Sequence, residues 1–342
     1  MQFAFTEDQL ALAEAARDML VDTCQPENLR KMLADGSTFD EDRWGTIVEM
    51  GLPGMLAPED RGGMGLGMAD FIGIAEAAGY VALPEPLIEL AGVTVPLLAR
   101  LDDPNDLLGS AMGGNIVAIG HPSNPFVIHA DRAIALILAD GENIHLVDAV
   151  DAKCAALDGF DAFRPLSKVD WAPSASPVAG TGWGDTADRG ALLAAAQMVG
   201  LGQRCIDIAV AYAMDRTQFG KPIGSYQAVK HLAADAQVAI EFARPVVHAA
   251  AAEFDTGTLA SRARIAHAKI VAGEAADLAS RNALQMLGAM GFTREADLHF
   301  WLKRIHGLNH AWGTPARHMQ IVLERIERLP VGSDATFASE LG

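Results

Sequence analysis

The apolar positions divide the chain into three parts with different periods. In residues 1–112 they recur at helical spacing, and a capping box from Thr6 to Gln9 predicts where the first helix begins. Residues 51–67 contain six glycines and two prolines in seventeen positions, which predicts a shaped loop rather than a helix. Helical spacing resumes at 68–79. The first part is therefore expected to be a helical domain.

In the second part, residues 113–182, the apolar residues occur in short runs rather than at helical spacing. Short runs rich in Val and Ile alternate with Gly, Pro, Asn and Asp, a pattern typical of strands and turns. Five such runs stand out: NIVAIG, FVIHA, AIALILA, NIHLVDA and CAALDG. About five strands make one average sheet, so a small β domain is expected here.

Helical spacing returns in the third part, residues 183–342. Four long segments rich in Ala, the last around residues 321–326, are joined by short connections and predict an antiparallel four-helix bundle. The expected fold is mainly α, with an N-terminal helical domain (1–112), a small, shortened central β domain (113–182) and a C-terminal bundle (183–342).

Composition narrows the possible functions. Half of the 342 residues are apolar and no tract is of low complexity, which indicates a globular protein. The formal net charge of -18 argues against nucleic acid or an anionic membrane as the main partner. The N-terminus does not have the pattern of a signal peptide, and no apolar run reaches the ~18 residues of a membrane span. A cytoplasmic protein is expected.

The usual metal and nucleotide motifs are missing from the sequence. The three cysteines are far apart and predict neither a disulfide framework nor a zinc site. His306 and His310 have the i,i+4 spacing of a metal pair, but Gly307 lies between them and no third ligand is near, so no metal site is expected. GGMGLG at 62–67 does not fit GxGxxG and follows no strand, which argues against a dinucleotide fold.

One stretch, RTQFGKPIGSYQ at 216–227, suggests binding chemistry. Arg216 closes a long helical segment, a Gly-Lys-Pro break follows, and Ser225 is a plausible N-cap for the next helix, with Gln227 in its first turn. A guanidinium beside free N–H groups at a helix start suits a pyrophosphate, and Phe219 adds an apolar face. On the residues alone, an ordinary helical corner with a capping arginine is an equal alternative.

This stretch resembles the R-x-x-F-G-x-x-[LI]-x-x-x-Q signature of the flavin-dependent acyl-CoA dehydrogenases. Three further segments resemble the family: LPGMLAPEDRGGMGLG (52–67), QMLGAMGFTRE (285–295) and HAWGT (310–314). The order helical domain, β domain, helical bundle is also that of the family. The resemblance covers nearly the whole chain.

The resemblance implies oxidation of an acyl-CoA thioester between Cα and Cβ, with a glutamate as base and FAD as hydride acceptor. In such proteins the Arg/Phe-Gly motif of one subunit contacts the FAD bound mainly by its neighbour. The cofactor-binding residues carried over are Arg216, Gln218, Phe219 and Gln227 for the pyrophosphate and adjoining parts, and Gln285 and Gly288 for the adenine end.

The chain departs from the family in three ways. Its β domain lacks the stretches that normally cover the isoalloxazine and the acyl chain. Ala289 replaces the second glycine of the Gly-Gly pair near the adenine. The two positions at which family members carry the glutamate base fall on Trp312 and Gly190, and neither residue can accept a proton. No catalytic residue is therefore predicted.

Three hypotheses follow. The chain is a degenerate subunit of a hetero-oligomer, such as α2β2, in which a homologous full-length subunit supplies the base. Alternatively it is a homodimer or tetramer with a base at another position, for which Asp188, Glu295 and Asp297 are the nearest carboxylates. The third possibility is a non-catalytic scaffold or binding protein that keeps the fold.

Overall fold

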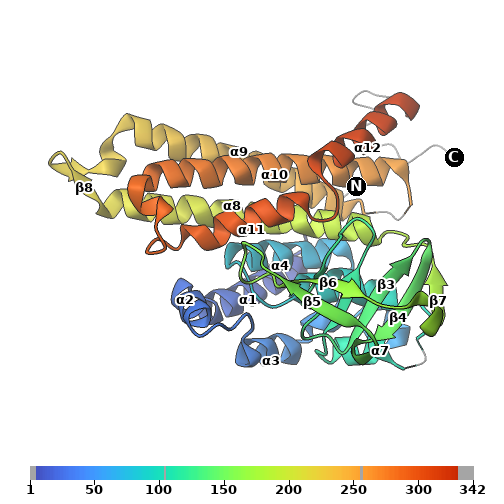
Figure 1. Ribbon diagram of the computed structural model, residues 1–342. Coiled ribbons are helices and arrows are strands. Elements are labelled where there is room, and N and C mark those ends of the chain that lie inside the picture. Colours follow the sequence, from blue (N-terminus) through green and yellow to red (C-terminus); the bar gives the residue numbers. More distant parts are fainter. Residues whose placement is uncertain (1–4, 104, 255–256, 330–342) are drawn as a thin grey trace.

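The computed structural model describes residues 5–103, 105–254 and 257–329. The fold is mainly helical with a small β unit, as predicted. Figure 1 shows the N-terminal helices packed along one side of a long helical bundle, with the β unit beside them at one end. The predicted domain limits fall in the connections before the first strand and after the seventh, and the division into domains stays a prediction.

The N-terminal part is built from helices around α4 (Met68–Tyr80). α1 (Glu7–Thr23) begins with the predicted capping box, in which the Gln9 N–H donates to Thr6 Oγ1 at 3.2 Å and the Thr6 N–H donates to Gln9 Oε1 at 3.0 Å. The other elements are α2 (Pro26–Ala34), α3 (Glu41–Glu49), the 3-10 turns η1 (Leu52–Gly54) and η2 (Glu59–Arg61), α5 (Leu87–Glu89), the π-helical turn η3 (Leu90–Thr94), α6 (Val95–Leu98) and α7 (Leu107–Met112).

Within the described chain, seven strands form the two sheets of the β unit. One sheet has the order β1-β3-β4-β7 and the other β2-β6-β5; β1 and β3 are parallel, and the remaining pairs are antiparallel. The strands are β1 (Val117–Gly120), β2 (Val127–Ile128), β3 (Ala135–Asp140), β4 (Asn143–Asp148), β5 (Lys153–Leu157), β6 (Leu166–Asp170) and β7 (Val178–Thr181). The expected number, about five, was too low because LSKVD and VAGT carry too few apolar residues to look like buried strands.

The bundle consists of α8 (Thr186–Asp215), α9 (Gln227–Ala252), α10 (Leu259–Leu287) and α11 (Leu298–His310). Its fourth helix is α11, which packs against α8 and α10. The segment predicted for that place forms α12 (Pro315–Arg328), which packs on α10 and projects from the end of the bundle (Figure 1). Residues 330–342 of the predicted bundle domain lie outside the described residues.

Two glycines let the N-terminal helices meet the bundle at very short range. A Cβ atom at Gly79 of α4 would lie 2.1 Å from the Gln197 carbonyl oxygen of α8, and a Cβ at Gly200 would lie 1.9 Å from that of Glu76. Any larger residue would separate the helices. The contact fixes the N-terminal part against the bundle.

A single guanidinium joins all three parts of the fold. Arg304 of α11 is 5% exposed; its Nε donates to Asp161 Oδ2 in the β unit at 2.6 Å, and Nη1 donates to the Leu83 carbonyl oxygen after α4 at 2.8 Å. Its Nη2 donates to the Phe163 carbonyl oxygen at 3.4 Å. Arg304 thereby holds the β unit against the helices that form the cavity described below.

Candidate cofactor site and closed cleft

The RTQFGKPIGSYQ stretch forms a short hairpin at one end of the bundle (Figure 1). β8 (Thr217–Gln218) pairs with β9 (Lys221–Pro222), and the Ile223 N–H donates to the Arg216 carbonyl oxygen at 2.8 Å. Arg216 caps the C-terminus of α8, as predicted. Phe219, in the turn, has φ +54° and is 92% exposed. The hairpin therefore presents an aromatic ring to the outside of the chain.

The second half of the hairpin differs from the prediction at Ser225. Its Oγ donates to the Pro222 carbonyl oxygen at 2.7 Å within a 3-10 turn, so it does not cap α9. Tyr226 is the N-cap residue instead, without a side-chain cap bond, and Gln227 is the first residue of α9. The first backbone N–H groups of α9 thus have no side-chain cap and can donate to a ligand.

The predicted adenine-end residues lie at the same end of the bundle. Asn282 of α10 donates its Nδ2 to the Leu232 carbonyl oxygen of α9 at 2.9 Å. Because the two helices are antiparallel with equal rise, residues five positions further along, 227 and 287, are also level. The residues predicted to bind the cofactor are all exposed: Arg216, Gln218, Phe219, Gln227, Gln285 and Gly288.

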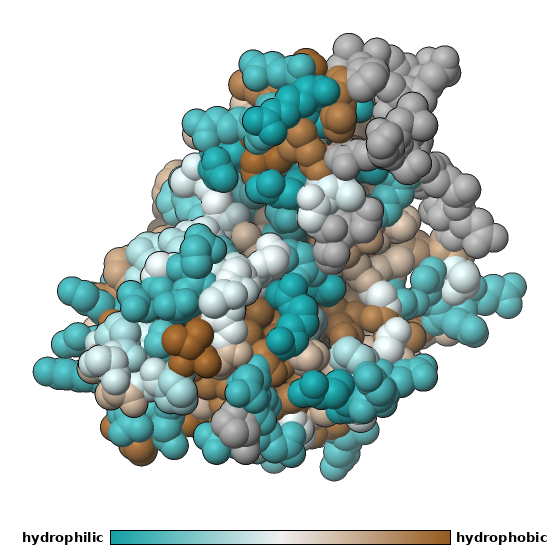
Figure 2. Space-filling view, turned by 90° about the vertical axis from the view of Figure 1, so that its right-hand side faces the viewer, coloured by the Kyte–Doolittle hydropathy of each residue, from teal (hydrophilic) through white to brown (hydrophobic). Residues whose placement is uncertain are grey.

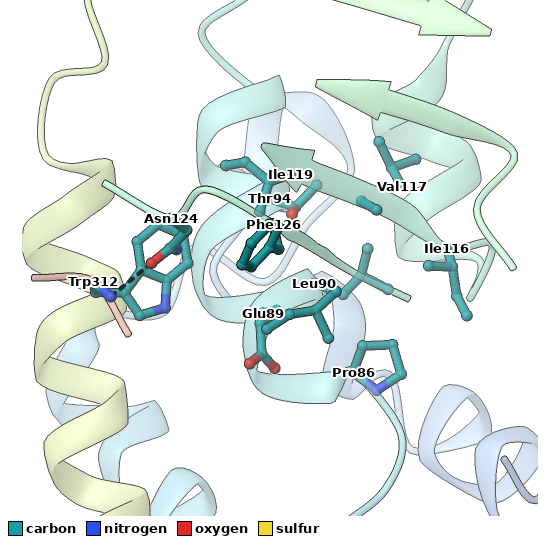
Figure 3. Close-up of a pocket in the computed structure, with 12 residues that line it drawn as sticks. Pro86, Glu89, Leu90, Thr94, Ile116, Val117, Ile119, Asn124, Phe126 and Trp312 are labelled. Atoms are coloured by element: carbon teal, nitrogen blue, oxygen red, sulfur yellow. Dashed lines mark hydrogen bonds between the residues drawn. The ribbon is translucent and has the colours of Figure 1, made fainter. Parts of the chain in front are cut away.

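A second region of interest lies between η3, β1 and the loop after α11, where Trp312 forms one wall (Figure 3). Trp312 is 4% exposed, has φ +60° and donates its backbone N–H to Asn124 Oδ1 at 2.8 Å. The cavity next to it has a volume of about 20 Å³, room for about one water molecule. Thr94 Oγ1, which is buried and has no partner within the described residues, also lines it.

Trp312 fills the space above Gly190 of α8. A Cβ atom at position 190 would lie 2.2 Å from Cδ2 of the indole. The two positions on which the resemblance places the family's glutamate base therefore touch each other in this fold. Both are occupied by residues without a carboxylate.

Aromatic side chains close the boundary between the β unit and the bundle beside Trp312. The His121 ring meets the Trp183 ring edge-on at a centroid distance of 4.8 Å and lies 5.6 Å from the Trp312 ring. Its Nδ1 is 2.7 Å from Ser123 Oγ. Burial lowers the pKa of His121 to about 4, so this ring is neutral at neutral pH.

None of the three carboxylates considered from the sequence lines this cavity. Asp188 lies 3.5 Å from Arg262, and burial raises its pKa; Asp297 accepts hydrogen bonds from Arg30; Glu295 is exposed. The carboxylate that does line it is Glu89 of α5. Sequence reasoning missed Glu89 because LIELAG carries no motif.

Glu89 is engaged in an ion pair. Its carboxylate lies 3.7 Å from Arg164, and the two side chains are 19% and 11% exposed. Burial lowers the pKa of Arg164, with Glu89 acting in the opposite direction. The pair belongs to the polar lining between the N-terminal part and the β unit.

The described residues contain no group of three or more His, Cys, Asp or Glu side chains placed to hold a metal ion. His306 and His310 contact each other through their rings, with centroids 5.5 Å apart. The three cysteines are free thiols. Over the ranges that the structure covers, no helix has both the length and the apolar character needed to cross a membrane.

Family models match both helical parts of the chain. The acyl-CoA dehydrogenase N-terminal domain matches residues 6–100, and the acyl-CoA dehydrogenase C-terminal domain matches residues 184–327. The chain is 33% identical over 319 residues to acyl-CoA dehydrogenase IpdE2 of Mycolicibacterium smegmatis, covering 92% of this chain and 97% of that protein. It is 30% identical over 322 residues to IpdE2 of Mycobacterium tuberculosis, covering 94% and 96%.

Solved structures share the fold at lower identity. The chain superposes with a TM-score of 0.82 and 22% identity on a chain of the ChsE4-ChsE5 complex from Mycobacterium tuberculosis, covering 97% of this chain and 100% of that one. Butyryl-CoA dehydrogenase from Megasphaera elsdenii gives 0.81 and 18%, covering 96% and 100%. PigA with FAD and proline gives 0.81 and 19%, covering 96% and 99%. With two matching domain models and a full-length relative at 33% identity, this chain belongs to the acyl-CoA dehydrogenase family.

Proposed function

We propose that this chain is a subunit of a hetero-oligomeric acyl-CoA dehydrogenase whose hairpin completes the FAD site of a homologous partner subunit. One observation carries this proposal: the signature residues are exposed at one end of the bundle, whereas the chain's own cleft is closed and has no base at the family positions. The ChsE4-ChsE5 neighbour, which is a complex of two differently named chains, supports such an assembly.

The hairpin end fits the pyrophosphate and adenosine half of FAD. Within the described ranges the Arg216 guanidinium has no hydrogen-bond or ion-pair partner, so it is free to pair with a phosphate. The uncapped N–H groups of α9 supply further donors, and Phe219 supplies an apolar face. A Cβ atom at Gly220 or at Gly288 would have no neighbouring side chain or distant backbone within 4 Å. This leaves room for a ligand to approach the backbone.

The cleft beside Trp312 does not fit a flavin. Asn124, His121 and Trp183 pack around the indole, and the remaining cavity has a volume of about 20 Å³. No flavin is assigned to this cleft. We therefore expect one FAD for each pair of one such chain and one catalytic partner.

In the proposed assembly the hairpin of this chain helps to bind FAD, and the partner subunit supplies the base that accepts the proton. In the family reaction an acyl-CoA is oxidised between Cα and Cβ, with FAD as hydride acceptor. In this chain Arg216 would neutralise the pyrophosphate, and Phe219 would shield the ligand from water. The proton on Cα has to go to a carboxylate of the partner, because Trp312 and Gly190 offer none.

Exposed apolar side chains support association with another chain. On α12, Met319, Leu323 and Ile326 follow helical spacing and are 45%, 50% and 50% exposed. Figure 2 shows apolar patches among hydrophilic residues on the face that carries the α12 end of the bundle and the β unit. Sedimentation is expected to give a species heavier than the 36.1 kDa monomer at micromolar concentration.

The decisive experiment is co-purification from the native host, followed by a flavin spectrum. A yellow complex beside a colourless isolated chain is the expected result. A yellow isolated chain would favour the homo-oligomer, and an absence of flavin in both would favour the non-catalytic scaffold.

Arg216→Ala tests the assigned residue within that complex. Truncating a buried guanidinium paired with a pyrophosphate commonly costs about 2–5 kcal/mol, so FAD affinity should fall tens- to thousands-fold. Arg328→Ala, at the surface of α12, is the matched control and should leave the affinity unchanged. Unaltered FAD affinity in Arg216→Ala would refute the assignment.

A further inference from the structure

The hairpin turn contains a residue in an unfavourable backbone conformation. Phe219 has φ +54°, in the left-handed region that residues with a Cβ rarely occupy. Its ring is 92% exposed, so burial within the chain does not compensate for that conformation. Other contacts must keep the turn in this shape before a ligand arrives.

Tyr226 supplies contacts of this kind from the start of α9. Its hydroxyl donates to the Gln218 carbonyl oxygen at 3.4 Å, and Lys221 Nζ lies 4.2 Å from the centroid of its ring. The Phe219 ring meets the Tyr226 ring edge-on, with centroids 6.5 Å apart and planes at 89°. Tyr226 is the N-cap residue of the 26-residue helix α9, with extended backbone (φ -80°, ψ 134°). The turn therefore packs against the Tyr226 ring at the start of α9.

We infer that Tyr226 and Lys221 are positioning residues that hold the Phe219-Gly220 turn in the shape it presents to the partner's FAD. This inference rests on the function proposed above. Both residues occupy variable positions of the family signature, so the motif itself does not assign them. Lys221 contributes through a cation–π contact, which also keeps a positive charge beside the turn.

The expected loss of FAD affinity depends on the fraction of hairpins that have the FAD-binding conformation. The apparent dissociation constant rises in proportion as the fraction of competent hairpins falls. Loss of the anchoring ring is expected to weaken FAD binding about 3–10-fold, and a tenfold loss corresponds to about 1.4 kcal/mol. This is smaller than the loss expected for Arg216→Ala, since the cation that pairs with the phosphate is retained.

Two measurements on the same variants test the inference. Tyr226→Leu removes the ring, and Tyr226→Phe removes only the hydroxyl. FAD affinity is measured in the assembled complex, and hydrogen–deuterium exchange of the amides of residues 217–224 is measured in the isolated chain. Tyr226→Leu should show faster exchange and weaker binding, while Tyr226→Phe should keep most of both properties.

Lys221→Gln extends the test to the second positioning residue. It should speed the exchange of the same amides. Lys230→Gln, an exposed lysine further along α9, is the matched control and should change neither property. If Lys221→Gln exchanges as slowly as the wild type, Lys221 has no positioning role.

The other outcomes are also decisive. Unchanged exchange in Tyr226→Leu would overturn the inference, and so would weaker FAD binding without faster exchange, because the ring would then contact the ligand directly. Faster exchange with unchanged affinity would overturn it as well, provided that Arg216→Ala does weaken binding. If Arg216→Ala does not change FAD affinity, the proposed function fails. The exchange rates of residues 217–224 then still show whether Tyr226 stabilises the turn.

Discussion

Gly190 and Trp312 are in direct contact, with Cδ2 of the indole 2.2 Å from where a Cβ of residue 190 would be. They come from different elements, the first turns of α8 and the loop after α11, and the resemblance places the family's glutamate base at these two positions. The indole can lie here only because residue 190 has no side chain. The residues at these two positions therefore belong to a single packing arrangement.

The first prediction concerns this contact. Gly190→Ala should destabilise the fold by about 1–3 kcal/mol, the usual cost of overpacking a core, although alanine favours a helix interior over glycine. Gly307→Ala in α11 is the matched control, because nothing lies within 4 Å of a Cβ built there. Its stability should be unchanged or higher. Urea denaturation measures both.

A double-mutant cycle shows whether the indole is the cause. In a Trp312→Ala background the added methyl at position 190 has space, so the cost of Gly190→Ala should largely disappear. Trp312→Ala alone should cost about 3–5 kcal/mol as a large-to-small core substitution. If the two costs simply add, the contact with Trp312 is not what makes Gly190 necessary.

The second prediction concerns Arg304. Arg304→Met should destabilise the chain by about 3–5 kcal/mol, because it leaves the buried Asp161 carboxylate without its cation. Arg328→Met removes an exposed arginine that pairs with Glu324 across one helical turn, and its effect should stay within ~0.5 kcal/mol. Equal denaturation midpoints for the two variants would show that the bonds of Arg304 do not stabilise the fold.

The fold was predictable in segments whose apolar residues recur at a single spacing, either that of a helix or that of a strand. α11 was missed because its buried stripe of Leu298, Trp301 and Ile305 is interleaved with charged residues and histidines. One of these, Arg304, is itself buried, because its partners come from distant segments. A local pattern cannot indicate such partners.

Part of the candidate site could be proposed from the sequence. The hairpin residues lie in one stretch whose spacing resembles the family signature, and their role in cofactor binding stays a prediction. The contact between Gly190 and Trp312, and the position of Glu89 beside the cavity, arise only when separate elements pack together. Ser225 was a reasonable N-cap by residue type, but a 3-10 turn moves the helix start to the following residues.

The third prediction concerns pH. Burial lowers the pKa values of His121 and His318 to about 4 and that of His129 to about 3, below the ordinary value of 6.5. Between those values the unfolded chain binds more protons than the folded chain, so stability rises with pH. The contribution of the neutral rings is complete above pH 6.5 and is lost as pH falls towards 4.

Urea midpoints measured from pH 7.5 to pH 4.5 test this dependence. The midpoint should fall steadily below pH 6.5. His121→Gln, which cannot take up a proton, should show a shallower decline than the wild type over the same range. Equal midpoints at pH 7 and pH 5 would contradict the buried, neutral state of these rings.

The last prediction concerns the missing base. The isolated chain should not oxidise acyl-CoA, because a positioned base supplies about 10²–10⁴-fold of the rate. Trp312→Glu should not restore activity, although it returns a carboxylate to a family position. Residue 312 lies among mainly apolar side chains, and such surroundings raise the pKa of a carboxyl group and keep it protonated. The assay is turnover with an artificial electron acceptor across short, medium, branched and polycyclic acyl-CoAs. Turnover by the isolated wild-type chain would overturn the division of labour and make Glu89, the carboxylate that lines the cavity, the first residue to test as the base.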